Sequence, residues 1–472
     1  MRKSRQMKNA APARVKLGAL AAAIAIGTLA SPLRAEDLSQ IYAQAREADP
    51  TLAAADANRL ATKEGSPQAR AALLPQINGS YGYNRSNGNS SPATSDITGA
   101  LEAGTQFTRA RSRPASVTLS QSLFNWGNIE RLRAANALSE GADFSYDAAS
   151  QALLVRTATA YFNVLTAEDQ LAFSQANEKS LQKQLDQADE RFKVGLSAIT
   201  DVHVARAQHD SAVAGVIVAQ NFVETQREAL VQIIGKNFGD LKKLRDPVPL
   251  DKPVPGDMQA WVDLAEKQNP SLASAQKSVD SAEHGISASR AGHYPTLGAT
   301  LTRSDTPNWG SGWVDVPGHA GGPHLSSNGL VGNTTIGVSL SIPIFSGGLV
   351  SSQTRQAVYQ RDAAQDQLEI TRRGVVANTR NAYRTVISGI SEVEAAKAAV
   401  VSAQSAVDAT QAGFEVGTKT ILDVLTSQSQ LVSAQSSYSQ ARHNFVLSGL
   451  LLKQSAGAIA TRDLDSVNAL LQ

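Results

Sequence analysis

Few side chains of this 472-residue sequence have types and spacings that could support chemistry. His319 and His324 lie in the glycine-rich stretch GHAGGPH, but no third ligand for a metal ion stands nearby. His203 and His209 are six residues apart, a spacing that places them on different faces of a helix. The sequence contains no cysteine and none of the motifs GxxxxGKS/T, HExxH or GxSxG. We therefore expect no enzyme activity, no cofactor and no metal site.

Four other polar or aromatic side chains of interest belong to a stretch that occurs twice. RFKVGLSAITDVHVARAQHD (191–210) returns as GFEVGTKTILDVLTSQSQLV (413–432), and 7 of the 20 positions are identical. Gly195 and Gly417 can take the left-handed conformation that ends a helix, and the polar residues that follow, Asp201 among them, can cap a returning helix. The sequence therefore predicts two helical hairpin tips. These tips carry Asp201, Phe414, Lys419 and Asp423.

The tips are part of a tandem repeat that spans most of the chain. Residues 45–55 align with 265–275, and residues 117–128 align with 338–349, in the same order and with offsets of 220 and 221. Blocks that recur in order with so little drift indicate an internal duplication. The predicted organisation is a leader (1–35), a first structural repeat (36–256, ending in the proline-rich connector 237–256) and a second structural repeat (257–472).

Each repeat contains a stretch that is long enough for an extended helix. No proline occurs from 128 to 194 or from 349 to 416, and about 65 residues at 1.5 Å per residue give a rod about 100 Å long. A shorter helix is predicted to run back from each tip. Earlier in each repeat, an Asp-Pro or Asn-Pro pair (49–50 and 269–270) predicts a break at which the first residue caps the next helix.

Residues 1–35 have the features of a secretory signal peptide. They hold seven basic residues, no acidic residue, an apolar run from Leu17 to Ala30, and the small residue Ala35 as a cleavage point. A membrane anchor is the alternative, but the run is shorter than the roughly 20 residues that span a bilayer. Without the leader the formal charge changes from +2 to 37 − 42 = −5. Net charge therefore gives no reason to expect nucleic acid as a partner.

Four short segments alternate apolar and polar side chains as β-strands do. They are INGSYGYN, SVTLSQSLF, TLGATLTR and TIGVSLSIPIF, each about 8–11 residues long, and each pair brackets a polar loop, 86–114 or 306–333. For any single segment, a soluble sheet with one wet face is the alternative to a membrane strand. The aromatic residues near the segment ends are expected to lie at the membrane interfaces: Tyr81, Tyr83, Phe124, Trp126, Tyr294 and Phe345.

Strand number predicts that the chain oligomerises. Four strands cannot close a barrel, for which about eight is the practical minimum, and open edges are not tolerated in lipid. A homotrimer would supply twelve strands, an even number that can close, above a ring of helices. The expected fold is therefore mainly α with a small membrane β-barrel portion, in which long antiparallel helical hairpins form a trimeric α-barrel.

The motifs described above resemble those of the TolC outer-membrane channel family. The two tip motifs, the segment AEDLSQIYAQAREADPTL and the strand-to-helix junction SLSIPIFSGG carry the resemblance, which covers nearly all of residues 36–465. It implies a homotrimer with a 12-stranded barrel in outer-membrane lipid and a helical tunnel in the periplasm. It also implies a periplasmic membrane-fusion adaptor and an inner-membrane pump, either an ABC transporter or a proton-driven pump, as partners.

The resemblance also implies a gate at the hairpin tips. Asp201 would link to the basic residue of the second tip, here Lys419, and Asp423 matches a ring of carboxylates. The sequence departs from the family where Phe414 replaces a common tyrosine and where Thr426 replaces a second carboxylate. The alternative is that Asp201 and Asp423 act only as helix caps.

The function implied by the family is passive transport. The chain would be the outer-membrane exit duct of a tripartite system for type I protein secretion, efflux of small toxic compounds, or both, opened at its periplasmic tips by the adaptor and pump. The alternative from another class is a secreted trimeric helical fibre or adhesin without channel activity.

Overall fold

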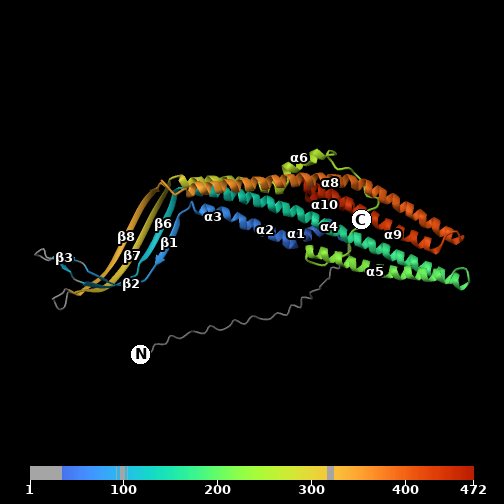
Figure 1. Ribbon diagram of the computed structural model, residues 1–472, viewed down its shortest axis with the longest axis horizontal. Coiled ribbons are helices and arrows are strands. Elements are labelled where there is room, and N and C mark those ends of the chain that lie inside the picture. The colour runs from blue at the N-terminus through green and yellow to red at the C-terminus, as the bar shows by residue number, and fades with distance from the viewer. Residues whose placement is uncertain (1–34, 92, 96–100, 104, 316–323) are drawn as a thin grey trace, which may run out of the picture.

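The computed structural model describes residues 35–91, 93–95, 101–103, 105–315 and 324–472. Apart from Ala35, the predicted signal peptide lies outside the described residues, and so does His319. The molecule is elongated, with a β-sheet at one end and the tips of two helical hairpins at the other (Figure 1). Helix α1 and the C-terminus lie near the middle (Figure 1).

Helices form the body, and the same order of elements occurs in both repeats. The first repeat has α1 (Leu38–Ala48), α2 (Pro50–Lys63), α3 (Gly65–Ala71), α4 (Trp126–Lys193) and α5 (Ile199–Ile234). The second has α6 (Met258–Gln268), α7 (Pro270–Arg290), the 3-10 turn η1 (Ala291–His293), α8 (Leu349–Glu415), α9 (Ile421–Ser455) and α10 (Thr461–Asn468). The predicted extended helices are confirmed as α4, with 68 residues, and α8, with 67.

The predicted helix breaks are present and are built from side-chain caps. Asp49 ends α1, and its carboxylate accepts a hydrogen bond at 2.7 Å from the amide of Leu52 in α2. Asn269 plays the same part between α6 and α7. Pro50 and Pro270 each occupy the first position of the new helix, where the missing N–H costs nothing. Short stacked helices therefore run beside the long ones. None of the helices that the structure describes has both the length and the apolar character needed to cross a membrane.

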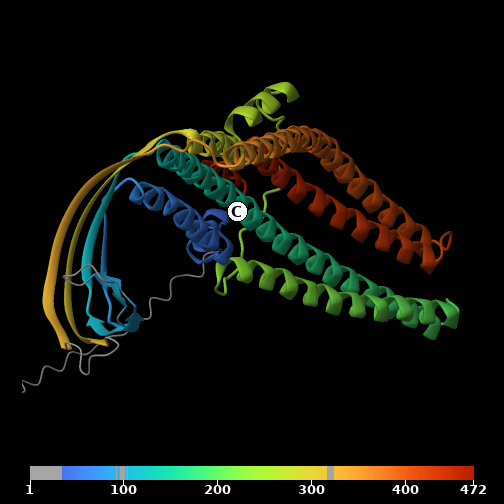
Figure 2. The ribbon, with the colours of Figure 1, turned by 60° about the vertical axis from the view of Figure 1, so that its left-hand side comes forward.

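The sheet is an antiparallel meander of four long strands, two of which are interrupted. Its strands are β1 (Gln76–Tyr81), β2 (Asn84–Ser90), β5 (Thr105–Ser112), β6 (Ala115–Phe124), β7 (Thr296–Asp315) and β8 (His324–Ser341). Near the helices the order is β1–β6–β7–β8, and further out it is β2–β5–β7–β8. A small hairpin, β3 (Ala93–Ser95) with β4 (Leu101–Ala103), extends from this end. Figure 2 shows that the sheet is curved.

The prediction of loops over 86–114 and 306–333 is wrong in extent. Strands continue through much of both ranges, and β7 and β8 reach 20 and 18 residues instead of about 8–11. The outer parts of these strands, such as NRSNGNS in β2, are polar at almost every position and therefore lack the alternation that marks a half-buried strand. Their pairing comes from main-chain hydrogen bonds to neighbouring strands, which composition does not reveal.

The main hydrophobic core lies in the middle of the body, where the chain ends and the connector meet the long helices. Tyr161 and Phe162 of α4 are fully buried there. The Tyr161 hydroxyl donates to the main-chain oxygen of Lys242 at 2.8 Å, so the connector is fixed to α4. Glu36 forms a parallel bridge with Leu241, which adds the start of the described chain to the same cluster.

Candidate gate at the hairpin tips and membrane-facing sheet

Both hairpin tips end their outgoing helix with the same backbone motif. Gly195 has φ +77° and Gly417 has φ +80°, in the left-handed region that favours glycine. At the first tip, the amide of Leu196 donates to the carbonyl of Arg191 at 2.8 Å. At the second tip, the amide of Thr418 donates to the carbonyl of Gly413 at 2.8 Å. These 6→1 bonds are the Schellman pattern and satisfy carbonyls that the helix end leaves open.

The returning helices begin differently at the two tips. Thr420 caps α9 in a reciprocal capping box, in which the Asp423 carboxylate accepts from the Thr420 amide at 2.9 Å. That bond, a second one from the Thr420 hydroxyl and the charge of Lys419 lower the pKa of Asp423. At the first tip Ala198 is the N-cap, without a side-chain bond, and Asp201 lies in the first turn. The prediction that Asp201 caps α5 is therefore wrong, although its charge still favours the positive end of the helix.

Asp201 and Lys419 occupy different tips of the protomer. Among the ion pairs of the described residues, none joins these two side chains. Ion pairing at the first tip instead involves Lys193, which contacts Asp189 at 2.9 Å and Glu190 at 2.8 Å. The hydrogen bonds that Lys193 donates to these two carboxylates raise its pKa.

Phe414 is one of the side chains that join the two hairpins near their tips. It is 9% exposed and packs in a cluster with Leu181 of α4 and Val424 of α9. The guanidinium group of Arg191 lies 4.6 Å from the centre of its ring, a cation–π contact. Phe192, which occupies the equivalent position in the first repeat, is 40% exposed. The two repeats therefore share a turn but use its phenylalanine in different ways.

A polar seam between α4 and α9 holds the hairpins together closer to the body. His443 is 2% exposed, and its Nδ1 lies 2.8 Å from the hydroxyl of Thr166. Ser439 donates to Asp169, and Arg442 lies 3.9 Å from the same carboxylate. Burial lowers the pKa of His443 to about 4, with Asp169 opposing this shift and Arg442 adding to it. The histidine is therefore neutral at neutral pH.

The two faces of the sheet differ in chemistry. Paired residues on adjacent strands point to the same face, so one face carries Leu301 together with its partners Leu119 and Ile336. Ile336 is 79% exposed. The opposite face carries small polar side chains, exemplified by the Thr118–Thr302 hydroxyl contact at 3.2 Å. A face of exposed apolar side chains suits lipid, and a face of hydroxyls suits a water-filled lumen.

The aromatic residues expected at the membrane interfaces fall into two groups along the sheet. Phe124, Trp126, Tyr294 and Phe345 lie at the junction with the helices, whereas Tyr81 and Tyr83 lie further out. Further aromatic residues that sequence analysis missed are Phe107, Trp309 and Trp313. Tyr83 and Trp309 have ring centres 6.4 Å apart, and Phe107 stacks on Trp313 at 4.9 Å. The missed residues fall in the ranges read as loops, where two tryptophans in a polar stretch were the available signal.

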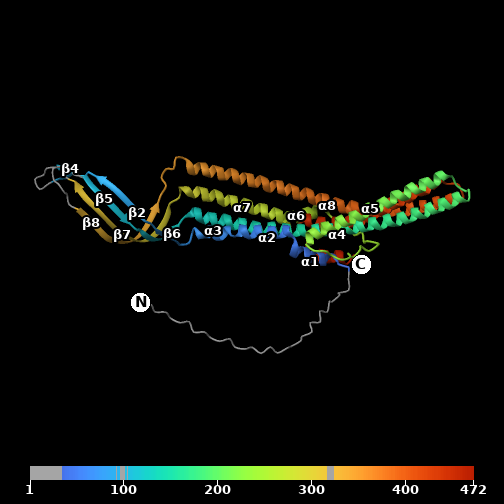
Figure 3. The same ribbon diagram turned by 90° about the horizontal axis from the view of Figure 1, so that it is seen from below.

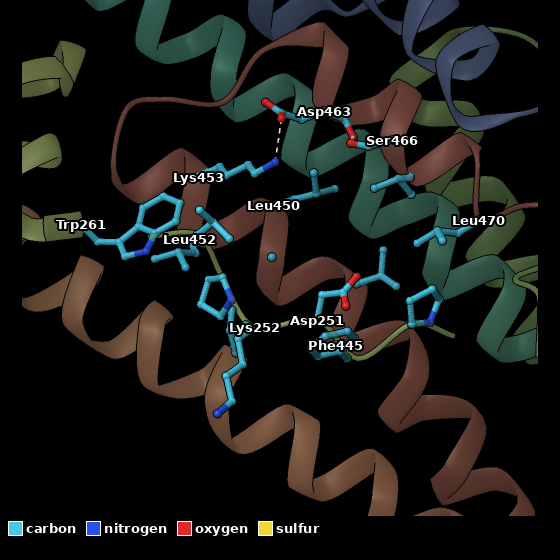
Figure 4. A pocket seen from close by; sticks show the side chains of 17 residues that line it. Asp251, Lys252, Trp261, Phe445, Leu450, Leu452, Lys453, Asp463, Ser466 and Leu470 are labelled. Atoms are coloured by element: carbon cyan, nitrogen blue, oxygen red, sulfur yellow. Dashed lines mark hydrogen bonds and ion pairs between the residues drawn. The ribbon is translucent and has the colours of Figure 1, made fainter. Parts of the chain in front are cut away.

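A cavity of about 350 Å³ lies in the body between the connector, α6, α8, α9 and α10. Apolar side chains such as Trp261, Phe445 and Leu450 line it (Figure 4). Lys453 and Asp463 form an ion pair at 2.7 Å on one side (Figure 4). Within the described residues, no group of three or more His, Cys, Asp or Glu side chains is arranged to hold a metal ion. The mainly apolar lining is typical of a gap between packed elements. Among the described residues that line it, no group of side chains is arranged for catalysis.

Comparisons with known proteins agree with this arrangement. The family model described as outer membrane efflux protein matches residues 41–236 and 261–458, one block in each repeat. The chain is 37% identical to outer membrane protein TolC of Vibrio cholerae over 96% of its own length and 98% of the relative. It is 38% identical to TolC of Escherichia coli K12, over 94% and 87%. The Campylobacter jejuni CmeC outer membrane channel has a similar fold, with a TM-score of 0.70 at 17% identity, over 93% and 90%.

The matched blocks contain both hairpin tips and all of the long helices, so the similarity covers the parts that form the candidate gate. Family and fold are those of a passive channel, and relatives of this kind are proteins of the outer membrane. The chain therefore belongs to the outer membrane efflux protein family, as an outer-membrane exit duct and not an enzyme.

Proposed function

We propose that three copies of this chain assemble into one duct, with a 12-stranded barrel in outer-membrane lipid and a helical tunnel in the periplasm. The observation that carries the proposal is the pair of open sheet edges. Within the described residues, neither the outer side of β1 and β2 nor that of β8 has a partner strand. Unpaired main-chain groups are not tolerated in lipid, and four strands are too few to close.

Disulfide cross-linking tests the trimer directly, because the natural sequence contains no cysteine. Gly79→Cys on the β1 edge would be combined with a cysteine at Gly332, Thr334 or Ile336 on the β8 edge. At least one pair should give a trimer that survives denaturation under non-reducing conditions. The matched control combines Gly79→Cys with Val117→Cys, which are register partners within one protomer and should leave a monomer. Monomers from every edge pair would refute the assembly.

We further propose that the tips narrow the entrance and that Asp201 of one hairpin pairs with Lys419 of another in the assembled duct. Support comes from the repeat, which places the two residues at equivalent turns, and from the absence of another ion-pair partner for either among the described residues. Asp423 is already bonded to Thr420, so a ring of three such carboxylates would coexist with helix capping.

Single-channel conductance tests the gate. Exposed ion pairs contribute about 0.2–1 kcal/mol each, so three in a ring would shift the closed–open equilibrium by a factor between about 3 and about 150. Asp201→Ala combined with Lys419→Ala should therefore raise the time-averaged conductance. Asp189→Ala is the control, because it removes a carboxylate of the same tip that pairs with Lys193. Equal conductance in the double variant and the wild type would remove the pair from the mechanism.

The partners proposed for the duct are a periplasmic adaptor and an inner-membrane pump, of the ABC or proton-driven type, which would supply the energy. Its cargo would be secreted protein, small toxic compounds or both. Loss of export after deletion of the chain, restored by the wild type but not by a closed cross-linked variant, would establish this role. The alternative of a secreted fibre gains no support from the comparisons, because the relatives are outer-membrane channels.

A further inference from the structure

The outer end of the sheet carries a group of arginines on its apolar face. Arg109, Arg111 and Arg113, here called the arginine ladder, lie two residues apart along β5 and just beyond it. Alternation puts them on one face, the face that also carries Val117 and Leu119 nearer the helices. All three are exposed. Figure 3 shows β5 between β2 and β7 at the end of the molecule remote from the hairpin tips.

Strand length places the arginine ladder at the far boundary of the membrane. On β7 this face begins at Leu297, is apolar as far as Leu301, then carries the Arg303–Asp305 ion pair, and reaches Pro307 beside Arg113. Ten residues at about 3.4 Å each, tilted by about 45°, rise about 24 Å, which matches an apolar band about 25 Å tall. The ladder therefore starts where the hydrocarbon layer ends, among the headgroups of the outer leaflet.

Aromatic side chains contact two of the three arginines of the ladder. The guanidinium of Arg113 lies 5.1 Å from the ring centre of Trp309 and 6.0 Å from that of Tyr83. That of Arg109 lies 5.7 Å from the ring centre of Trp313. Stacking uses the flat face of a guanidinium group and leaves its in-plane N–H donors for an anion. Among the described residues, no side-chain hydrogen bond or ion pair engages these ladder guanidinium groups.

Charge on this face is unbalanced. Arg85 of β2 stands directly opposite Arg111 in the register, and like charges in that position destabilise a sheet unless an anion lies between them. On β7 between 296 and 313, the carboxylate of this face is Asp305, which already pairs with Arg303 at 2.7 Å. Below the ladder, Gly79 and Ala115 leave a shallow hollow of about 370 Å³ beside that ion pair.

We propose that the arginine ladder binds the phosphorylated headgroup of lipopolysaccharide in the outer leaflet. Arg109, Arg111 and Arg113 donate to phosphate oxygens, for which the guanidinium fork is the matched donor. The aromatic side chains lie against the sugar and upper acyl region, and the hollow receives part of the same lipid. The inference rests on the assembly proposed above, because that assembly turns this face towards lipid.

Binding of O-antigen-free lipopolysaccharide to the detergent-purified wild-type protein tests the proposal. The comparison ligands are the same glycolipid after removal of its phosphates, and phosphatidylglycerol. Lipopolysaccharide should bind most tightly, and dephosphorylation should weaken binding at least about tenfold, since a hydrogen bond to a charged group contributes on that order. Equal binding of the phosphorylated and dephosphorylated forms, or stronger binding of phosphatidylglycerol, would overturn the inference.

The variant Arg109→Gln/Arg111→Gln/Arg113→Gln should show the same loss while it keeps the cross-linked trimer and the conductance of the wild type. The control, which removes equal charge from exposed positions of α8, is Arg373→Gln/Arg380→Gln/Arg384→Gln, and it should bind as the wild type does. An assembled ladder variant with undiminished binding would refute the inference but leave the duct intact. If the ladder variant does not assemble, the wild-type comparison of phosphorylated and dephosphorylated ligand decides. A wild type that forms no trimer would instead refute the assembly.

Discussion

Acid should weaken the contact between the two hairpins through His443. Thr166 donates its hydroxyl proton to the carbonyl of Phe162 at 2.8 Å, so it accepts a hydrogen bond from Nδ1–H of the neutral imidazole. The other groups that act on the ring are Asp169 and Arg442. Burial lowers the pKa of His443 to about 4, below the value of about 6.5 expected for an exposed histidine.

The sign and size follow from proton linkage. As pH falls, the opened segment takes up a proton before the packed segment does, so stability is present above about pH 6.5 and is lost towards pH 4. With pKa values of 6.5 when open and about 4 when packed, the free energy of opening falls by about 2.4 kcal/mol between pH 7 and pH 4.5. That change corresponds to about 60-fold more opening.

Hydrogen exchange of the α9 amides around His443 measures this opening, after correction for the intrinsic pH dependence of exchange. Protection in the wild type should fall by about 60-fold over this range. His443→Asn keeps a donor for Thr166 but binds no proton, so its protection should be lower than that of the wild type at pH 7 yet nearly constant with pH. His203→Asn, at an exposed position of α5, should retain the wild-type dependence. An equal loss of protection in His443→Asn and in the wild type would refute the assignment.

Three further predictions concern single contacts. Phe414→Ala should loosen the tips and raise the conductance, because it removes the ring that packs against Leu181. Phe192→Ala removes an exposed ring and should leave the conductance unchanged. Equal conductance in the two variants would contradict this prediction. Asp49→Ala should lower the free energy of unfolding by about 2 kcal/mol, because it removes a helix cap and the ion pair with Arg156. Asp49→Asn should restore the cap. An unchanged thermal melting temperature in Asp49→Ala would contradict this prediction. Gly457 has φ +70°, and a Cβ added to it would lie 2.6 Å from the Cα of Asn269, so Gly457→Ala should reduce the yield of folded protein. A yield equal to that of the wild type would disprove this strain.

The long helices and the breaks between the short ones follow from the sequence, because their signals are local. A proline-free stretch, a left-handed glycine and an Asp-Pro or Asn-Pro cap each act within one or two turns of chain. The extended helices, the two breaks and the tip glycines therefore appear where the sequence placed them. The inner halves of the four strands also follow from the sequence, since a half-apolar strand alternates with period two.

Contacts between distant segments were beyond the reach of such signals. Equivalent phenylalanines in the two repeats differ in exposure because Leu181 of the first hairpin packs on Phe414 of the second, a contact set by how the hairpins cross. The seam at His443 joins Thr166 and His443, which are 277 residues apart in sequence, and no local sequence pattern at either residue indicates the contact.

The sequence by itself determined the repeat, the long helices, the caps at the two helix breaks, and the four alternating strand segments. The tertiary structure alone decided how far the strands extend and what their outer ends carry. The polar outer strands have no alternating pattern, so only their register with β7 brings Arg109 and Arg113 beside Trp313 and Trp309. The preference for helix or strand depends on neighbouring residues, whereas the register of β5 with β7 depends on main-chain pairing between segments about 200 residues apart.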